Sequence, residues 1–313
     1  MAYSNCANSG VNTGSILCDK SKANARQHFI GGLQITSTTT TLQADLKAAS
    51  LLPKSNTSKL YPLPIIQDAT SKKDANKEGN LNYGFKITLI EGKPAYEYKV
   101  FGGTSLVKQL RKLNNKTVRV FELDDDNALW GTEIGTKIVG YQAKLFFDGQ
   151  LLGDAQKAEN GVITFQLSIL DNAEYFDKAK YFDVTSVDMT QIKALNDVQI
   201  VTTAATVANV FKLTGKITTA QAGVSLNVHD TYPTELSAAG LWVSYSGAAN
   251  TTIPITSVAN DVTNGGYTVT LDSATYTALA SGTSVSIGLA APSVLDAADV
   301  VDTESVVYTF LKP

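Results

Sequence analysis

Short segments in which apolar and polar residues alternate recur along most of this chain, and they restrict it to antiparallel β structure. The segments GYQAKLFF (140–147) and VITFQLSIL (162–170) are the clearest examples, and KTVRVFEL (116–123) and ALWGTEI (128–134) are also typical of strands. A period of two places the apolar residues on one face of a strand. These segments therefore predict an antiparallel meander with one buried face.

The residues before this meander predict a β-hairpin. Residues 83–89 alternate, the sequence EGKP (91–94) supplies a turn, and residues 96–100 alternate again. The stretch SKKDANKEGN (71–80) then becomes a long projecting loop. The prolines of YPLPII (61–66) cannot donate to a strand ladder, so this segment is expected at a sheet edge.

Three segments have helical patterns. In the first, Thr40 and Gln43 fit a capping box, and Pro53 stops the helix. The second is TSLVKQLRKLNN (104–115), which has apolar residues at helical spacing and an Asn pair at its end. The third, TQIKALNDV (190–198), is expected to lead out of a first domain.

The length of 313 residues and the charge distribution predict two domains. From Gln199 onward, three basic residues stand against eight acidic ones, a net charge of −5, whereas the whole chain carries −3. The later strands, such as LWVSYSG (241–247) and SVSIGLAA (284–291), are short and separated by turn signals. This spacing is typical of an immunoglobulin-like sandwich of about 100 residues, although the cysteine pair of antibody domains is absent.

The predicted fold is therefore mainly β (α+β). Residues 1–198 are expected to form an antiparallel β-sandwich or barrel with one or two flanking helices and an N-terminal arm (Met1 to Ile30). Residues 199–313 are expected to form the immunoglobulin-like sandwich. Charged residues make up only 18% of the chain, against a usual share of about 25%, a composition common among extracellular, virion and adhesive β-proteins.

Cys6 and Cys18 are the only cysteines. Their spacing fits no zinc motif, and an isolated pair is no disulfide framework, so free thiols are expected, although a bridge stays open. The first twenty residues do not resemble a secretory signal, and no apolar run is long enough to span a membrane.

The sequence LDDDNALWGT (123–132) is the most site-like stretch of the chain. Adjacent side chains on an extended segment point to opposite faces, so Asp124, Asp125 and Asp126 cannot converge on one ion without a special turn. Asp and Asn between two strands are ordinary turn residues. We expect a hairpin tip here, with a metal site as the alternative.

No catalytic, cofactor-binding or metal-ligating residue is predicted. His28 and His229 are the only histidines, fall in different expected domains, and belong to no catalytic motif. The basic residues near SKKDANKEG and KQLRKLNNK are interpreted as solvated surface rather than as a phosphate-binding site. Trp130 and Trp242 are expected in the cores.

The stretch from GKPAYEYKVF through LDDDNALWGT, followed by GYQAKLFF and ITFQLSIL, resembles the tail tube (major tail) proteins of tailed bacteriophages, especially those of Bacteroidetes hosts. The order of hairpin, helix, acidic turn ending in W-G-T and strand pair carries the resemblance, which covers roughly residues 60–183. Such proteins have a small β-sandwich or barrel, a flanking helix and a projecting hairpin or loop, and some carry an immunoglobulin-like domain.

The resemblance implies a structural virion protein and not an enzyme. It would assemble in the host cytoplasm into stacked, hexameric rings of the tail, contact other tail or virion proteins, let DNA pass without specific binding, and need neither cofactor nor membrane. Sheet edges and projecting segments would join the copies. Two alternatives stay open: another virion part, such as a capsid decoration protein or a fibre, and a surface module that binds carbohydrate.

Overall fold

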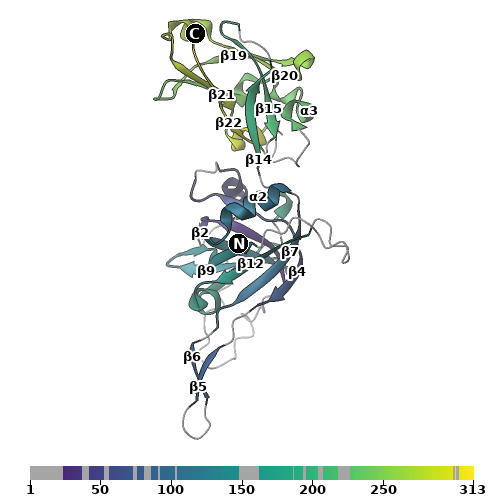
Figure 1. Ribbon diagram of the computed structural model, residues 1–313, viewed down its shortest axis with the longest axis vertical. Helices are drawn as coiled ribbons and strands as arrows, with labels where there is room; N and C mark the ends of the chain where they lie inside the picture. The colour runs from purple at the N-terminus through teal and green to yellow at the C-terminus, as the bar shows by residue number, and fades with distance from the viewer. Residues whose placement is uncertain are drawn as a thin grey trace. The chain divides into compact units, whose positions relative to one another are not determined.

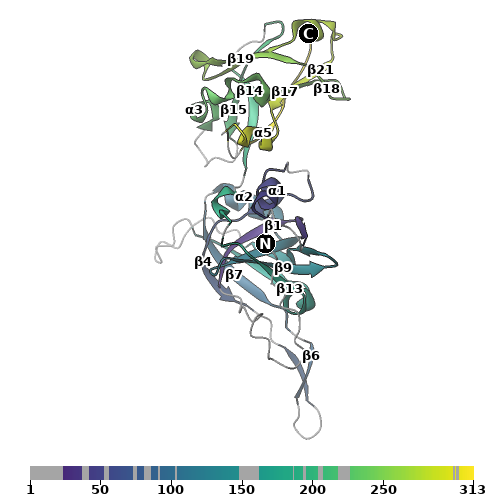
Figure 2. The same ribbon diagram turned by 180° about the vertical axis from the view of Figure 1, so that it is seen from behind.

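The computed structural model describes most of the chain, in two compact units. The described residues are 24–36, 42–52, 56–72, 76–80, 86–90, 92–102, 104–147, 162–185, 187–192, 195–203, 207–217, 226–298, 300 and 303–313. The N-terminal unit comprises Met1–Ser50 and Lys54–Lys193, and the C-terminal unit comprises Leu51–Pro53 and Ala194–Pro313. Both consist mainly of antiparallel strands (Figures 1 and 2), which confirms the predicted mainly-β fold class.

The N-terminal unit contains strands and two α-helices. Its strands are β1 (Ala25–Gly31), β2 (Gln34–Thr36), β3 (Leu60–Pro62), β4 (Ile66–Ser71), β5 (Lys77–Asn80), β6 (Lys86–Ile90), β7 (Ala95–Phe101), β8 (Thr117–Asp124), β9 (Ala128–Ile134), β10 (Lys137–Val139), β11 (Tyr141–Phe147), β12 (Val162–Ile169) and β13 (Ala179–Asp183). Its helices are α1 (Leu42–Ser50) and α2 (Thr104–Leu113), with a π-helical turn at Ala173–Asp177 and a 3-10 turn at Met189–Gln191.

Strand β8 is the centre of the large sheet, whose order is β2-β10-β9-β8-β11-β12-β7-β4. The first half of β8 pairs with β11 and its last residues with β9, while β1 pairs along its other side. Strands β1 and β8 are antiparallel, with Phe29 opposite Phe121 and Ile30 opposite Val120. The N-terminal arm expected at Met1 to Ile30 is therefore wrong for residues 25–30, which belong to β1 within the sheet. The predicted strands β8, β9, β11 and β12 are confirmed.

Both faces of β8 and β9 are covered, which explains their nearly continuous burial. On one face, apolar residues of β7, β11 and β12 form a core with Val120 and Trp130. On the other face, α1 packs with Phe121, Leu123 and Leu129 in a second core. A strand buried on both faces loses strict alternation, and two polar positions of β8, Glu122 and Asp124, are enclosed as a result.

The two predicted helices of this unit are confirmed. Helix α1 buries Leu42, Leu46 and Ala49, the face that the sequence pattern indicates. The proposed capping residue Thr40 lies outside the described residues. Helix α2 ends at Leu113, and Asn115 adopts the left-handed backbone (φ 61°) that asparagine tolerates better than most residues.

The hairpin predicted between residues 83–89 and 96–100 is wrong. Strand β6 pairs instead with β5, within the stretch interpreted as a loop, and the two strands form a separate two-stranded sheet. Strand β7 pairs with β4 and β12. Alternation indicates a strand but not its partner, and both pairings satisfy the same pattern. The β5–β6 ribbon extends away from the rest of the N-terminal unit (Figure 1).

The C-terminal unit is a two-sheet sandwich. Its strands are β14 (Asn196–Thr202), β15 (Val210–Ile217), β16 (Leu226–Asn227), β17 (Trp242–Ser246), β18 (Thr251–Thr252), β19 (Ile255–Asp261), β20 (Gly266–Leu271), β21 (Ser284–Leu289), β22 (Thr303–Val306) and β23 (Tyr308–Leu311). Its helices are α3 (Val228–Thr231), α4 (Ser273–Ala278) and α5 (Pro292–Asp296), with 3-10 turns at Glu235–Ser237, Ala239–Leu241 and Val262–Asn264.

One sheet has the order β19-β20-β15-β14-β22 and the other β18-β17-β21-β23. The last strands of the chain join both sheets, because β22 pairs in parallel with β14 and β23 pairs with β21. Trp242 is buried between the sheets and lies 5.5 Å from Tyr267, ring centre to ring centre.

The helical link expected at residues 190–198 is wrong. Its first residues end a single 3-10 turn, and from Asn196 onward the chain forms β14, which pairs with β15 and β22 inside the C-terminal unit. The change of unit therefore falls at Lys193 and Ala194, before the boundary expected at residues 198 and 199. The local apolar spacing also fits a strand that is buried at Val198 and Ile200.

Candidate functional site

The acidic stretch forms the tip of the β8–β9 hairpin, as predicted. Leu123 pairs with Leu129 across the hairpin, and Asn127 holds the turn with a left-handed backbone (φ 54°). Asp124 is fully buried, whereas Asp125 and Asp126 are exposed. The three carboxylates therefore do not share a site, and no group of His, Cys, Asp or Glu among the described residues is arranged to hold a metal ion.

Asp124 has a structural role that the sequence does not reveal. Its Oδ1 accepts a hydrogen bond from the backbone N–H of Ala128 at 2.7 Å, and its Oδ2 accepts one from Trp130 Nε1 at 2.7 Å. Hydrogen bonds to a carboxylate acceptor are stronger than hydrogen bonds between neutral groups. This carboxylate therefore closes the turn and anchors the buried indole of the W-G-T sequence.

The two histidines are core residues of different units. His28 is fully buried, and its ring meets that of Tyr98 edge-on with centroids 4.4 Å apart. His229 is almost fully buried, and its Nε2 lies 2.7 Å from Asn260 Oδ1. Ring packing places His28, and packing together with the contact to Asn260 places His229.

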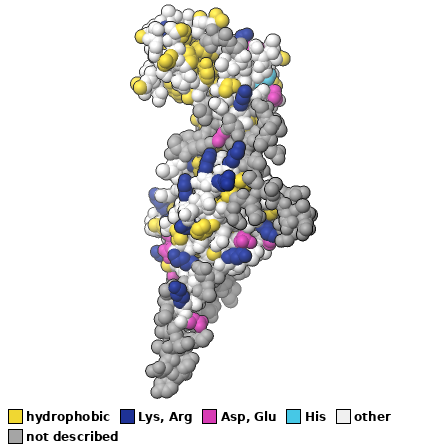
Figure 3. All heavy atoms as spheres, in the orientation of Figure 1, with side chains coloured by type: hydrophobic (Ala, Val, Ile, Leu, Met, Phe, Trp, Pro, Cys, Tyr) yellow, Lys and Arg dark blue, Asp and Glu magenta, His cyan; other side chains and the backbone are white. Residues whose placement is uncertain are grey.

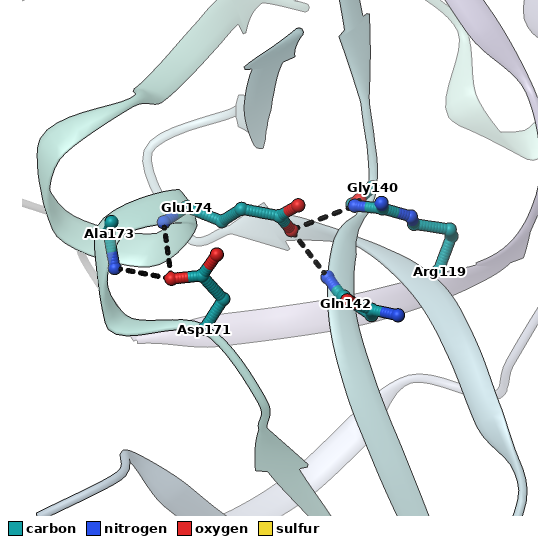
Figure 4. A network of polar contacts seen from close by, with 6 residues as sticks. All are labelled: Arg119, Gly140, Gln142, Asp171, Ala173 and Glu174. Atoms are coloured by element: carbon teal, nitrogen blue, oxygen red, sulfur yellow. Dashed lines mark hydrogen bonds and ion pairs between the residues drawn. The ribbon is translucent and has the colours of Figure 1, made fainter.

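A polar network connects the π-helical turn to strands β8 and β11 (Figure 4). Glu174 Oε2 accepts hydrogen bonds from Arg119 at 2.8 Å and from the backbone N–H of Gln142 at 3.1 Å. Arg119 also donates to the carbonyl of Gly140 at 3.1 Å, and Asp171 accepts from the backbone at Ala173 and Glu174. The network holds the π-helical turn in place, and its polar groups hydrogen-bond to one another within the fold.

Tyrosines line the core beside this network. The hydroxyl of Tyr175 donates toward that of Tyr96 at 3.4 Å, and its ring lies 4.8 Å from that of Tyr141. Burial raises the pKa of Tyr98, Tyr141 and Tyr175 above the ordinary value for a phenol. These phenols therefore stay neutral and contribute to packing.

Helix α2 presents basic side chains to solvent. Lys108, Arg111 and Lys112 are exposed, and dark-blue side chains gather over this helix in Figure 3. No ion pair with another described residue engages them. Their spacing is that of the wet face of an amphipathic helix, which agrees with the predicted solvated surface.

The features best placed to contact another molecule are strand edges. The β5–β6 ribbon pairs with no other described strand, and β4 pairs only with β7 among the described residues. All residues of β4 after Ile66 are exposed. Isolated two-stranded ribbons are marginally stable in water, and exposed sheet edges are templates for pairing. We therefore treat the ribbon and β4 as the candidate assembly edge.

Comparison with known proteins gives no identification: no family model, no curated protein and no solved structure matches the chain. Cys6 and Cys18 lie outside the described residues. No helix among the residues that the structure describes is long and apolar enough to cross a bilayer. Sequence reasoning missed the ribbon and the Arg119–Glu174 network. Gly79 and Asn80, which would indicate a turn by residue type, lie inside strand β5 opposite Ile87 and Lys86, so no local signal predicted the ribbon.

Proposed function

We propose that this chain is a structural subunit that assembles with copies of itself into stacked rings, as the tail tube of a tailed bacteriophage. The resemblance of residues 60–183 to tail tube proteins suggests the role. The observation that carries the proposal is the β5–β6 ribbon, a two-stranded sheet that pairs with no other described strand and extends from the N-terminal unit (Figure 1).

The ribbon supports assembly because of its energetics. Two strands alone cannot bury enough surface to offset the entropy of ordering them. Contact with a neighbouring copy would supply the missing partner and would order the ribbon at the same time. A projecting element of this kind suits a subunit that reaches across to the next copy in a ring or to the next ring.

Strand β4 offers a second contact. It is the last strand of the sheet, its residues are mostly exposed, and charge is confined to Asp68, which lies 3.7 Å from Lys99 of the neighbouring strand β7. Because the single charge of β4 is paired within its own sheet, this strand edge has little protection against pairing with a strand of another copy. In a ring, the edge strand of each copy would extend the sheet of its neighbour.

Electron microscopy of the full-length protein tests the proposal directly. Purified protein is expected to form rings or stacked tubes in negative stain. Replacement of Lys77–Ile90 by a short Gly-Ser turn is expected to abolish them, whereas a chain that ends at Ile192 should still assemble. A full-length protein that stays monomeric at high concentration contradicts the proposal.

A charge on the edge gives a finer test. Ala69→Lys places a cation on exposed strand β4 and should weaken assembly. Ser257→Lys is the matched control, because Ser257 is exposed on β19, which ends a sheet of the C-terminal unit. Equal effects of the two substitutions would remove β4 from the contact. Analytical ultracentrifugation gives the size distributions.

A further inference from the structure

One sheet of the C-terminal unit contains no charged residue. Its four strands, β18, β17, β21 and β23, have the sequences TT, WVSYS, SVSIGL and YTFL. The opposite sheet of the same unit does contain charged residues, among them Lys212, Lys216 and Asp261. The absence of charge is therefore a property of one sheet. Figure 3 shows the C-terminal unit as mostly white and yellow, with few charged side chains in that view.

A row of hydroxyl-bearing residues crosses the outer face of this sheet. Thr252 pairs with Tyr245, Tyr245 with Ser286, and Ser286 with Thr309, so that each of the four strands contributes one residue. All four side chains are at least partly exposed. Their neighbours along β17 and β21, Ser244, Ser246, Val285 and Ile287, are buried in the sandwich. The strand alternation thus points the row away from the core.

The row has unused hydrogen-bonding capacity. The hydroxyls of Ser286 and Thr309 lie 2.9 Å apart and share one bond, which leaves one donor and further lone pairs. The Tyr245 hydroxyl has no hydrogen bond to any residue that the structure describes, and its ring has no aromatic partner there. An aromatic ring between short hydroxyl side chains combines an apolar surface with several donors and acceptors.

The cross-strand neighbours of the row within the four described strands are also uncharged. Val243, which is partly buried against the sandwich core, lies opposite the buried Gly288, and Ser284 lies opposite the exposed Leu311. Natural sheet edges usually carry charges that prevent unwanted contacts, but neither β18 nor β23 does. A ligand for this face needs no countercharge.

We propose that the outer face of Tyr245, Thr252, Ser286 and Thr309 binds a neutral carbohydrate. One side of a pyranose ring presents C–H groups, whose partial positive charge suits the negative face of an aromatic ring. Its hydroxyls both donate and accept, as do those of Ser and Thr. A charged peptide or a nucleic acid would instead require basic or acidic side chains, which this face lacks. The proposal does not depend on ring assembly, because it concerns the C-terminal unit alone.

The test is binding of labelled full-length protein to an array of neutral and acidic oligosaccharides. Retention is expected on neutral glycans, with weaker signals on sialylated or uronic-acid glycans. For the best neutral oligosaccharide, Tyr245→Ala should weaken binding by about tenfold or more, which corresponds to about 1.4 kcal/mol. Tyr245→Phe should retain most of the binding if stacking dominates. Ser286→Asp should also weaken binding, because it places a charge on the face.

Tyr61→Ala is the matched control, since Tyr61 is a similarly exposed tyrosine of the N-terminal unit, 37% accessible. It should leave binding unchanged. Circular dichroism of each variant checks that the sandwich is folded. Absence of binding to every neutral glycan overturns the proposal. Binding that Tyr245→Ala and Ser286→Asp leave intact, or a change in oligomeric state caused by Tyr245→Ala without a change in glycan binding, overturns it as well.

Discussion

Removal of the Asp124 carboxylate should strongly destabilise the N-terminal unit. In Asp124→Ala, the N–H groups of Ala128 and Trp130 lose their acceptor, and both lie where little water enters: Ala128 is fully buried and Trp130 is 5% exposed. Each unpaired buried donor costs about 1–3 kcal/mol. Because the vacated space can admit some water, we expect a loss near the lower end of the sum, about 3 kcal/mol.

Urea unfolding followed by tryptophan fluorescence measures this loss. The chain has two tryptophans, one in each unit, so a Trp242→Phe background leaves Trp130 as the reporter of the N-terminal unit. The midpoint should shift without a change in the slope m. Asp124→Asn should lie between wild type and Asp124→Ala, because the amide oxygen still accepts from Ala128 while its NH2 group cannot accept from the indole.

Asp125→Ala is the control for the same turn. Asp125 is exposed, and its replacement should change stability by no more than about 0.5 kcal/mol. If Asp124→Ala lowers the free energy of unfolding by no more than Asp125→Ala does, the buried carboxylate does not stabilise the turn, and the reasoning is refuted.

Three further predictions concern single contacts. Arg119→Met should cost the N-terminal unit about 1–3 kcal/mol in urea, because it leaves nearly buried Glu174 without its cation; a neutral result would mean that water replaces Arg119. Asn127→Val should cost about 1–2 kcal/mol, since a β-branched residue resists the left-handed backbone. Asn127→Gly should cost less, because it keeps that backbone relaxed and loses only the hydrogen bond that Asn127 Oδ1 accepts from Arg26. Hydrogen bonds from Asn264 lower the pKa of Asp261. The stability that ionised Asp261 contributes is therefore present above the ordinary carboxyl pKa and is lost as the pH falls through the lowered pKa. Asp261→Asn should make the stability of the C-terminal unit less dependent on pH in acid, as measured by thermal unfolding at about pH 2 to 6.

Local pattern predicted the elements well where one rule decides the outcome. The alternation in residues 141–147 and 162–169 and the helical spacing in 104–113 each match an observed strand or helix. Turn chemistry correctly placed the hairpin tip at Asp125 to Asn127. These features depend on residues close in sequence, so the chain itself contains the information.

The sequence did not predict which strands pair with one another. The sequence of β6 fits pairing with β7 or with β5 equally well, and only the packing of β7 between β4 and β12 decides between them. The segment at 190–198 has spacing that suits a helix, yet the parallel contact of β14 with β22, far away in sequence, makes it a strand. Long-range contacts decide such cases because they bury more surface than local propensity contributes.

By itself, the sequence determined a mainly-β chain with two units, a turn at the acidic stretch, and a net acidic C-terminal part. The tertiary structure alone separated the three aspartates into one buried acceptor and two exposed groups, and aligned Thr252, Tyr245, Ser286 and Thr309 in one row. Burial and cross-strand register arise from contacts between distant segments. A side chain acquires either property only when those segments meet in the folded chain.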